Sequence, residues 1–296
     1  MTTRVSELQE IFTSQFPLFS RAIERGLATF GPSWGAQFEE TLNRVFPTPA
    51  ELSDAANAYA LFAIDMMRRQ RTFEQDRRYP DRSYQESMTE VYLDTDFMSR
   101  QYLPALLLSH YLWPHHYQQA NFFTSAFVST FALSENPEFI EVGVGTGIHS
   151  RWLLRTVSTA RGIGVDVSQA SLDFAARHVS VFDVADRYDT RLLDVLEDDL
   201  APVPWIICVE VIEHLEDPLV FLHALRRLLA PGGHAFITTA LNAAHVDHIY
   251  LYETSEQVID QLGWAGFTLE EAFLANAYAP RKQGLPVPAV AAFIVT

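Results

Sequence analysis

Cysteine is almost absent from this sequence. Cys208 is the single cysteine among 296 residues, so no disulfide can form within the chain, which is typical of an intracellular protein. The N-terminal segment MTTRVSELQE is polar and lacks the apolar core of a signal peptide. No apolar run approaches the roughly 20 residues of a membrane helix, and the stretch 102–113 stops at Pro114. These absences predict a cytoplasmic protein that does not span a membrane.

Basic residues are also scarce. The chain has 21 lysines and arginines against 37 aspartates and glutamates, which gives a formal net charge of −16. Nucleic-acid binding depends largely on Lys and Arg neutralising phosphates, and anionic membranes attract basic segments. The charge balance therefore argues against a nucleic-acid or membrane partner and favours a small neutral, cationic or zwitterionic substrate. It leaves open whether the chain forms a homo-oligomer.

The pattern of apolar residues divides the chain into two parts. Helical spacing dominates residues 1–134, whereas short apolar runs alternate with amphipathic segments over residues 135–296. This alternation predicts a mainly parallel sheet with helices on both faces. The expected strands lie at 139–143, 162–167, 191–195, 205–209, 234–239, 268–275 and 290–295. We therefore predict an all-helical cap over 1–134, which binds substrate, and an α/β domain over 135–296.

Three helices are expected at the start of the cap. Apolar spacing predicts one over residues 5–30 and a second over residues 33–46. A third begins after Thr48, which with Glu51 forms a capping box, and extends to about Arg77.

A glycine-rich loop follows the first expected strand. The strand carries Glu141 near its end and leads into Gly143, Gly145 and Gly147. Glycines let the backbone turn sharply and approach a ligand, and ligands bind beyond the carboxyl ends of strands in α/β sheets. A dinucleotide fingerprint would place its third glycine at Ile148, so the spacing disfavours an NAD oxidoreductase. A tight turn without a ligand is the simpler alternative.

The Glu-x-Gly-x-Gly-x-Gly segment resembles the first motif of class I methyltransferases that use S-adenosylmethionine. The resemblance implies that the three glycines border the amino-acid part of this cofactor, and that Glu141 receives its ammonium group directly or through water. Asp166, followed by Val167, ends the second strand, where the carboxylate would accept both ribose hydroxyls. Asp194 and Val195 resemble the end of the family's third strand, where an acid meets the adenine amino group.

Residues 210–214, Glu-Val-Ile-Glu-His, resemble a version of this family seen in ubiquinone-type O-methyltransferases and small-RNA 2′-O-methyltransferases. The resemblance extends from about residue 139 to the C-terminus. It implies a Rossmann-like, seven-stranded, mainly parallel sheet and methyl transfer to a small molecule. O-methylation of a secondary-metabolite-like acceptor is the first choice. Carbon or nitrogen acceptors, an RNA 2′-hydroxyl, and a binding protein without catalysis remain alternatives.

A divalent cation also follows from this resemblance. In the RNA-methylating relatives two glutamates and two histidines hold the ion, and Glu210, Glu213, His214 and His248 match them, with His245 as an alternate fourth ligand. Magnesium or manganese suits such a set, with zinc or iron as further candidates. The ion would lower the pKa of an acceptor hydroxyl. Glu213, His214 and His248 are accordingly the candidate catalytic residues, and Glu210 also borders the expected cofactor site.

Histidines and tyrosines gather just before the first expected strand. His110, His115 and His116 lie there, and imidazoles in such a segment could bind substrate or act as bases. For any one of them, a role in helix packing is the alternative.

Overall fold

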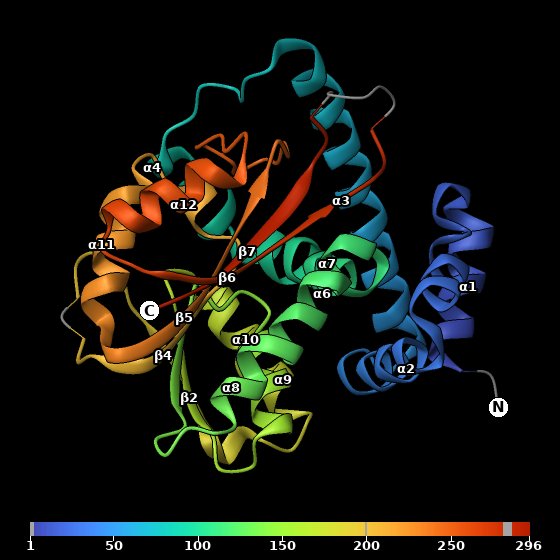
Figure 1. Ribbon diagram of the computed structural model, residues 1–296. Helices are drawn as coiled ribbons and strands as arrows, with labels where there is room; N and C mark the ends of the chain where they lie inside the picture. The colour runs from blue at the N-terminus through green and yellow to red at the C-terminus, as the bar shows by residue number, and fades with distance from the viewer. Residues whose placement is uncertain (1–2, 199, 281–285) are drawn as a thin grey trace.

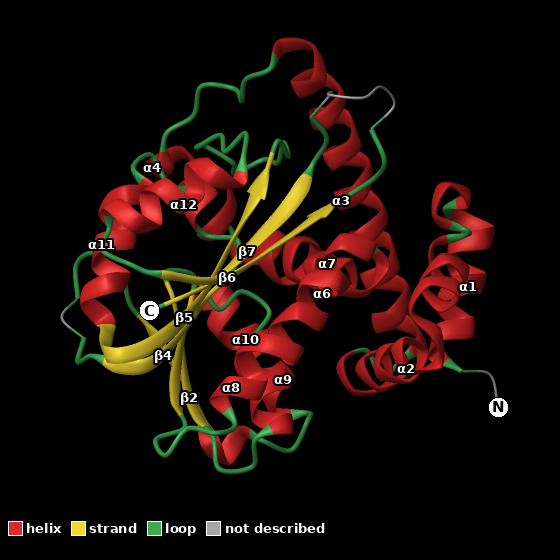
Figure 2. Ribbon diagram, in the orientation of Figure 1, coloured by secondary structure: helices red, strands yellow, loops and turns green. Residues whose placement is uncertain are grey.

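Seven strands form one sheet in the computed structural model, which describes residues 3–198, 200–280 and 286–296. The strand order is β3-β2-β1-β4-β5-β7-β6; β7 is antiparallel to β5 and β6, and the other neighbours are parallel. The strands are drawn yellow in Figure 2. The strands are β1 Glu138–Val142, β2 Arg161–Asp166, β3 Tyr188–Leu192, β4 Val203–Cys208, β5 Leu229–Leu241, β6 Leu269–Asn276 and β7 Ala289–Val295. This confirms the predicted mainly parallel, Rossmann-like α/β sheet.

Helices precede the sheet and connect its strands (Figure 1). The N-terminal helices are α1 Arg4–Gln15, α2 Ala22–Val45, α3 Pro49–Asp76, α4 Tyr84–Ser87, α5 Thr95–Phe97, α6 Leu103–Leu112, α7 Pro114–Phe122 and α8 Ser129–Phe131. Between strands lie α9 Ile148–Thr156, α10 Gln169–Ser180, α11 Pro218–Leu228 and α12 Ser255–Trp264. Short π-helical turns occupy 88–92, 98–102 and 123–128. In the described ranges, no helix combines the length and apolar character needed to cross a bilayer.

The two faces of the sheet belong to two different cores. Side chains alternate along a strand, so Trp205 and Ile207 of β4 face one core, and Ile206 and Cys208 face the other. The first core is covered by α6 to α10, and the second by α11 and α12, which lie together on one side of the sheet in Figure 1. Cys208 is thus a buried packing residue.

Aromatic side chains join the N-terminal helices to the first face of the sheet. Phe123 and Phe127, in the π-helical turn between α7 and α8, lie 5.0 and 5.6 Å from the Phe236 ring. Phe127 and Phe131 lie 5.4 and 5.1 Å from the Trp205 ring. Edge and tilted ring contacts of this kind add to the hydrophobic stabilisation of the area they bury. The helices and the sheet therefore share one core.

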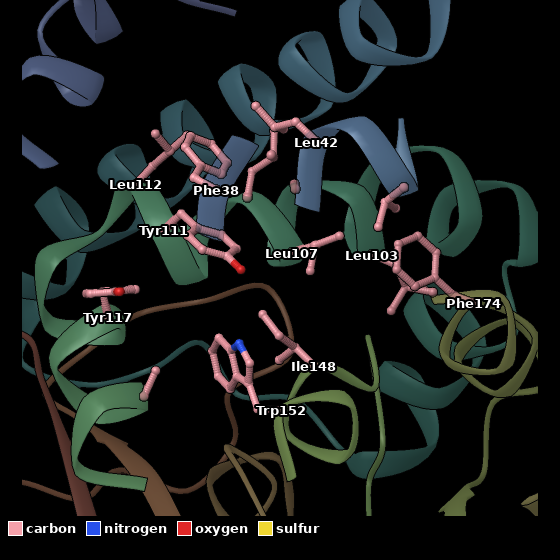
Figure 3. Close-up of a cluster of buried hydrophobic side chains, with 14 of the residues drawn as sticks. Phe38, Leu42, Leu103, Leu107, Tyr111, Leu112, Tyr117, Ile148, Trp152 and Phe174 are labelled. Atoms are coloured by element: carbon pink, nitrogen blue, oxygen red, sulfur yellow. The ribbon is translucent and has the colours of Figure 1, made fainter. Parts of the chain in front are cut away.

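A second contact links α2 and α6 to α9. Phe38 and Tyr111 stack 4.7 Å apart above Trp152 of α9 (Figure 3). The buried guanidinium of Arg151 donates to the hydroxyls of Tyr111, at 3.1 Å, and Thr41, at 3.4 Å. The cap is consequently held against the α/β domain by polar as well as apolar contacts.

The expectation of one helix over residues 5–30 is wrong. α1 ends at Gln15, because Pro17 lacks the backbone N–H that would continue the helical ladder. α2 begins at Ala22 and continues across Gly31, whose φ of 77° kinks it. The capping box of Thr48 and the helix that follows it are confirmed.

The shared core leads to a test at Phe127, which is 0% exposed. Replacing Phe127 with alanine removes contacts to both the cap and the sheet, so we expect a loss of about 3–5 kcal/mol in the free energy of unfolding. Urea unfolding should remain a single transition by circular dichroism and tryptophan fluorescence. Leu133→Ala, at a side chain 85% exposed, is the control and should change stability little. Separate unfolding of cap and sheet would contradict a shared core.

Candidate functional site

A cavity of about 1510 Å³ lies where the N-terminal helices cover the ends of β1, β2 and β4. It is larger than the ~300–1,000 Å³ of most small-molecule pockets. Ten of the sequence-predicted residues line it: Glu141, Gly143, Gly145, Asp166, Val167, Asp194, Val195, Glu210, His214 and His248. Gly147 and Glu213 are not among the lining residues. The structure thus brings residues from four strand ends to one cavity.

The three glycines of the loop are required by the backbone. Gly143, Gly145 and Gly147 have φ values of 69°, 48° and 69°, in the left-handed region that side chains disfavour. A Cβ at Gly143 would lie 2.5 Å from a Val211 methyl group, and one at Gly147 would lie 2.9 Å from the Ala175 Cβ. The loop can therefore pass closely over the cavity and enter α9.

Glu141 is anchored from behind the loop. It is buried, and one carboxylate oxygen accepts from the Ser150 N–H, at 3.0 Å, and from the Ser150 hydroxyl. The other oxygen lies 3.7 Å from Nδ1 of His149. One oxygen is thus fixed by α9, while the second is left for a donor at the cavity.

Asp166 holds the glycine loop from the end of β2. Its carboxylate accepts from the Gly145 N–H, at 3.1 Å, and from the Ser168 N–H, at 2.9 Å. Burial raises the pKa of Asp166 to about 6, although these backbone donors act in the opposite direction. The carboxylate is mostly ionised at neutral pH and can accept from a ligand's hydroxyls.

Asp194 does not lie at the end of a strand, as the expected strand over 191–195 would require. β3 ends at Leu192, and the Asp194 carboxylate accepts from the Leu196 N–H, at 2.9 Å, in the turn beyond it. Leu193 and Val195 pack against the core from this turn. Their burial explains why the apolar run resembled a strand.

Two glutamates lie at the end of β4. Glu210, with a left-handed φ of 52°, accepts from the Thr238 hydroxyl at 2.7 Å and from the Gln119 amide of α7 at 3.3 Å. Glu213 is fully buried and accepts from the Thr239 hydroxyl at 2.9 Å. Burial raises the pKa of both carboxyls, and the charge of Glu210 raises that of Glu213 further. A proton or a cation would stabilise this pair.

Three histidines gather beside these glutamates. Nδ1 of His214 lies 3.1 Å from the Asp247 carbonyl oxygen, Nδ1 of His248 lies 2.7 Å from the Ala243 carbonyl oxygen, and Nδ1 of His245 contacts the Asp247 carboxylate. Carbonyl and carboxylate oxygens only accept, so each Nδ1 carries a hydrogen, and a neutral ring in this tautomer has its lone pair at Nε2. The rings of His214 and His245 lie 4.9 and 5.5 Å from that of His248.

Part of the predicted metal-binding set is close together. One candidate ligand atom from each of Glu213, His214 and His248 lies within 4.8 Å of the other two. Glu210 does not belong to this group, whereas His245 forms a second one with Asp247 and His248. The described residues thus contain a carboxylate and imidazole cluster of the kind that binds divalent cations.

Asp247 was assigned no role from the sequence. It is fully buried and accepts from the hydroxyls of Tyr92 and Tyr102, each at 3.0 Å, as well as from His245. Burial by itself raises the pKa of Asp247, but the adjacent His245 and His214 outweigh burial and hold the pKa well below its usual value. The two tyrosines end consecutive π-helical turns of the cap, so Asp247 connects the cap to the histidines.

Comparison with known proteins places most of these elements in one family. The family model described as "Methyltransferase domain" matches residues 115–278, more than half of the chain. A ubiquinone biosynthesis O-methyltransferase of Alkalilimnicola ehrlichii is 30% identical over 129 residues, covering 43% of this chain and 51% of that protein. The ubiquinone biosynthesis O-methyltransferase of Hydrogenovibrio crunogenus is 28% identical over 137 residues, covering 45% of this chain and 55% of that protein. The chain thus spans about half the length of these curated relatives.

A solved structure shows the same fold. The crystal structure of the [4+2]-cyclase SpnF superposes with a TM-score of 0.55 at 16% sequence identity, covering 73% of this chain and 97% of that one. At this identity the likeness concerns the fold.

The buried Asp166 gives stability a specific pH dependence. Its folded pKa of about 6 lies above the ordinary aspartate value of 3.8. The folded state therefore binds the proton more tightly, and this residue's contribution to stability falls as pH rises from about 4 through 6. Asp166→Asn removes that dependence. Between pH 4.5 and 7.5, urea unfolding should show the stability of the variant rising relative to that of the wild type by about 2 kcal/mol.

Asp186→Asn, at an exposed aspartate, shows the effect of removing a surface carboxylate. A difference between Asp166→Asn and the wild type that does not change with pH would contradict the shifted pKa.

Proposed function

This chain belongs to the family of methyltransferase domains, and from that premise we propose that it transfers a methyl group from S-adenosylmethionine to a small-molecule acceptor. The observation that carries the proposal is the left-handed glycine loop between two acids, Glu141 and Asp166, on one cavity wall. The seven-stranded sheet with β7 antiparallel is the arrangement that the class I resemblance implies.

The cavity wall offers a partner for each part of the cofactor. The free oxygen of Glu141 would accept from its ammonium group, and Asp166 from its ribose hydroxyls. Asp194 would meet the adenine amino group, with Val167 and Val195 as apolar walls. The cofactor supplies a sulfonium that is reactive toward nucleophiles, so these residues contribute proximity and alignment, and the cap excludes water.

The acceptor is proposed to be large, apolar and hydroxylated. Many apolar cap residues line the cavity, among them Phe62, Met66, Leu103, Leu106 and Trp113. The volume of about 1510 Å³ leaves room for such an acceptor beside the cofactor. The curated O-methyltransferases among the relatives support oxygen as the methylated atom. Residues 1–134 would then act as a cap that shapes the acceptor pocket.

A divalent cation is the finer part of the proposal. Glu213, His214 and His248 would hold it, with His245 as a fourth ligand. The charge of Glu210 acts on Glu213, but Glu210 lies outside the three-residue group. Hydrogen bonds from each Nδ1 to an oxygen orient the rings as metal-binding histidines require. The imidazole-rich set favours manganese, zinc or iron over magnesium. The bound ion would lower the pKa of the acceptor hydroxyl.

Cofactor binding tests the core of this proposal. Calorimetric titration with S-adenosylhomocysteine should show binding to the wild type, and Asp166→Ala should weaken it about tenfold or more, because the charged hydrogen bonds to the ribose are lost. Asp186→Ala is the control and should bind as the wild type does. Absence of binding by the wild type would contradict the proposed activity.

Metal binding tests the finer proposal separately. After EDTA treatment, the protein should take up about one manganese ion per chain by elemental analysis. Glu213→Gln and His248→Ala should remove most of this uptake, since each deletes a ligand of the three-residue group. His234→Ala, a histidine paired with Glu270 at the other end of β5, should retain it. Equal uptake by all four proteins would contradict the assigned ligands.

A further inference from the structure

We propose that His110 and His116, with His149 beside them, bind the α-carboxylate of the cofactor's amino-acid part. This inference rests on the proposed function, and it assigns a role to cap histidines that the methyl-transfer site leaves without one. The three imidazoles line the same cavity as Glu141 and the glycine loop.

The rings form a continuous row that starts at Glu141. Nδ1 of His149 lies 3.7 Å from the Glu141 carboxylate. The His149 ring is 5.5 Å from that of His110, which is 5.8 Å from that of His116. Since Glu141 is placed to accept from the ammonium group, the carboxylate on the same carbon atom falls within reach of these imidazoles. One zwitterion would meet an acceptor and donors side by side.

Unused hydrogen-bonding capacity points to a ligand at this row. His110 is 6% exposed, yet its Nδ1 is buried without a hydrogen-bond partner among the described residues. Nε2 of His149, at 3% exposure, has none either. Buried polar groups are normally hydrogen-bonded, because leaving one unpaired destabilises the folded protein. Burial lowers the pKa of His110 and His116, so each is neutral and has one N–H to donate.

A buried positive charge behind the row favours an anion. Arg151 is 5% exposed and, within the described part of the chain, forms no ion pair; its guanidinium donates to two hydroxyls and lies 4.4 Å from the centre of the Phe182 ring. Its Nε has no hydrogen-bond partner among the residues that the structure describes. A buried charge without a counter-charge is costly. A carboxylate held by the histidines would bring a counter-charge close to this guanidinium, whose charge acts on His110.

The test compares two ligands that differ only in this carboxylate. S-adenosylhomocysteine and its decarboxylated analogue, the 3-aminopropyl thioether of adenosine, are titrated by calorimetry. The wild type should prefer S-adenosylhomocysteine by about tenfold or more, the strength of hydrogen bonds to a charged group. His110→Phe should lose most of that preference, with affinity for the analogue little changed. His110→Asn, which keeps a side-chain N–H, should retain part of it.

Controls separate this inference from the function on which it rests. His115→Phe is the matched control. The His115 ring stacks on Trp113 and contacts His116, at the end of the row that is farthest from Glu141. This variant should keep the preference, and melting temperatures confirm that each variant folds. Equal weakening of both ligands by His110→Phe, or a wild type without preference, would overturn the carboxylate site and leave the proposed function standing. A wild type that binds neither ligand would refute the proposed function itself.

Discussion

The aromatic contact between the cap and one face of the sheet is the constraint on which the site depends. Trp205 and Phe236 lie on central strands whose inner face must be covered, and Phe123, Phe127 and Phe131 cover it. Because this core is continuous, the helices that follow α5 cannot move away from the sheet without exposing large rings. The cavity is the space that remains between that cover and the strand ends.

Hydrogen bonds across the cavity fix the loop after β5 relative to the cap and to the end of β4. The buried carboxylate of Asp247 would be costly if left without donors, and two cap tyrosines and His245 satisfy it. The backbone N–H groups of Ile249 and Tyr250 both donate to the Glu213 carbonyl oxygen at 2.9 Å. The loop that carries the histidines is thereby fixed to both the cap and the β4 end, so its imidazoles are oriented before any ligand binds.

The charges around the cavity suit a cationic cofactor with a zwitterionic end. Acids lie at the ends of β1, β2 and β4, each anchored by backbone or hydroxyl donors, so they present charge at fixed positions. The one unpaired buried cation, among the described residues, is Arg151, on the cap side. This division would set the orientation of the amino-acid part, while the net charge of −16 disfavours polyanionic partners.

The sequence by itself determined the sheet class, the glycine loop and the acids that follow the strands. These depend on the local sequence: Gly147 adopts a left-handed backbone that favours glycine, and Asp166 directly follows the apolar run that forms β2. The prediction extended the third strand to residue 195, although β3 ends at Leu192. An apolar residue such as Leu193 can be buried from a turn as well as from a strand, so its presence does not mark the strand end. Only the tertiary structure decided which distant residues meet, such as Tyr102 with Asp247 or His110 with His149. Such contacts follow from how the helices pack on the sheet, and the spacing of residues along the chain does not predict that packing.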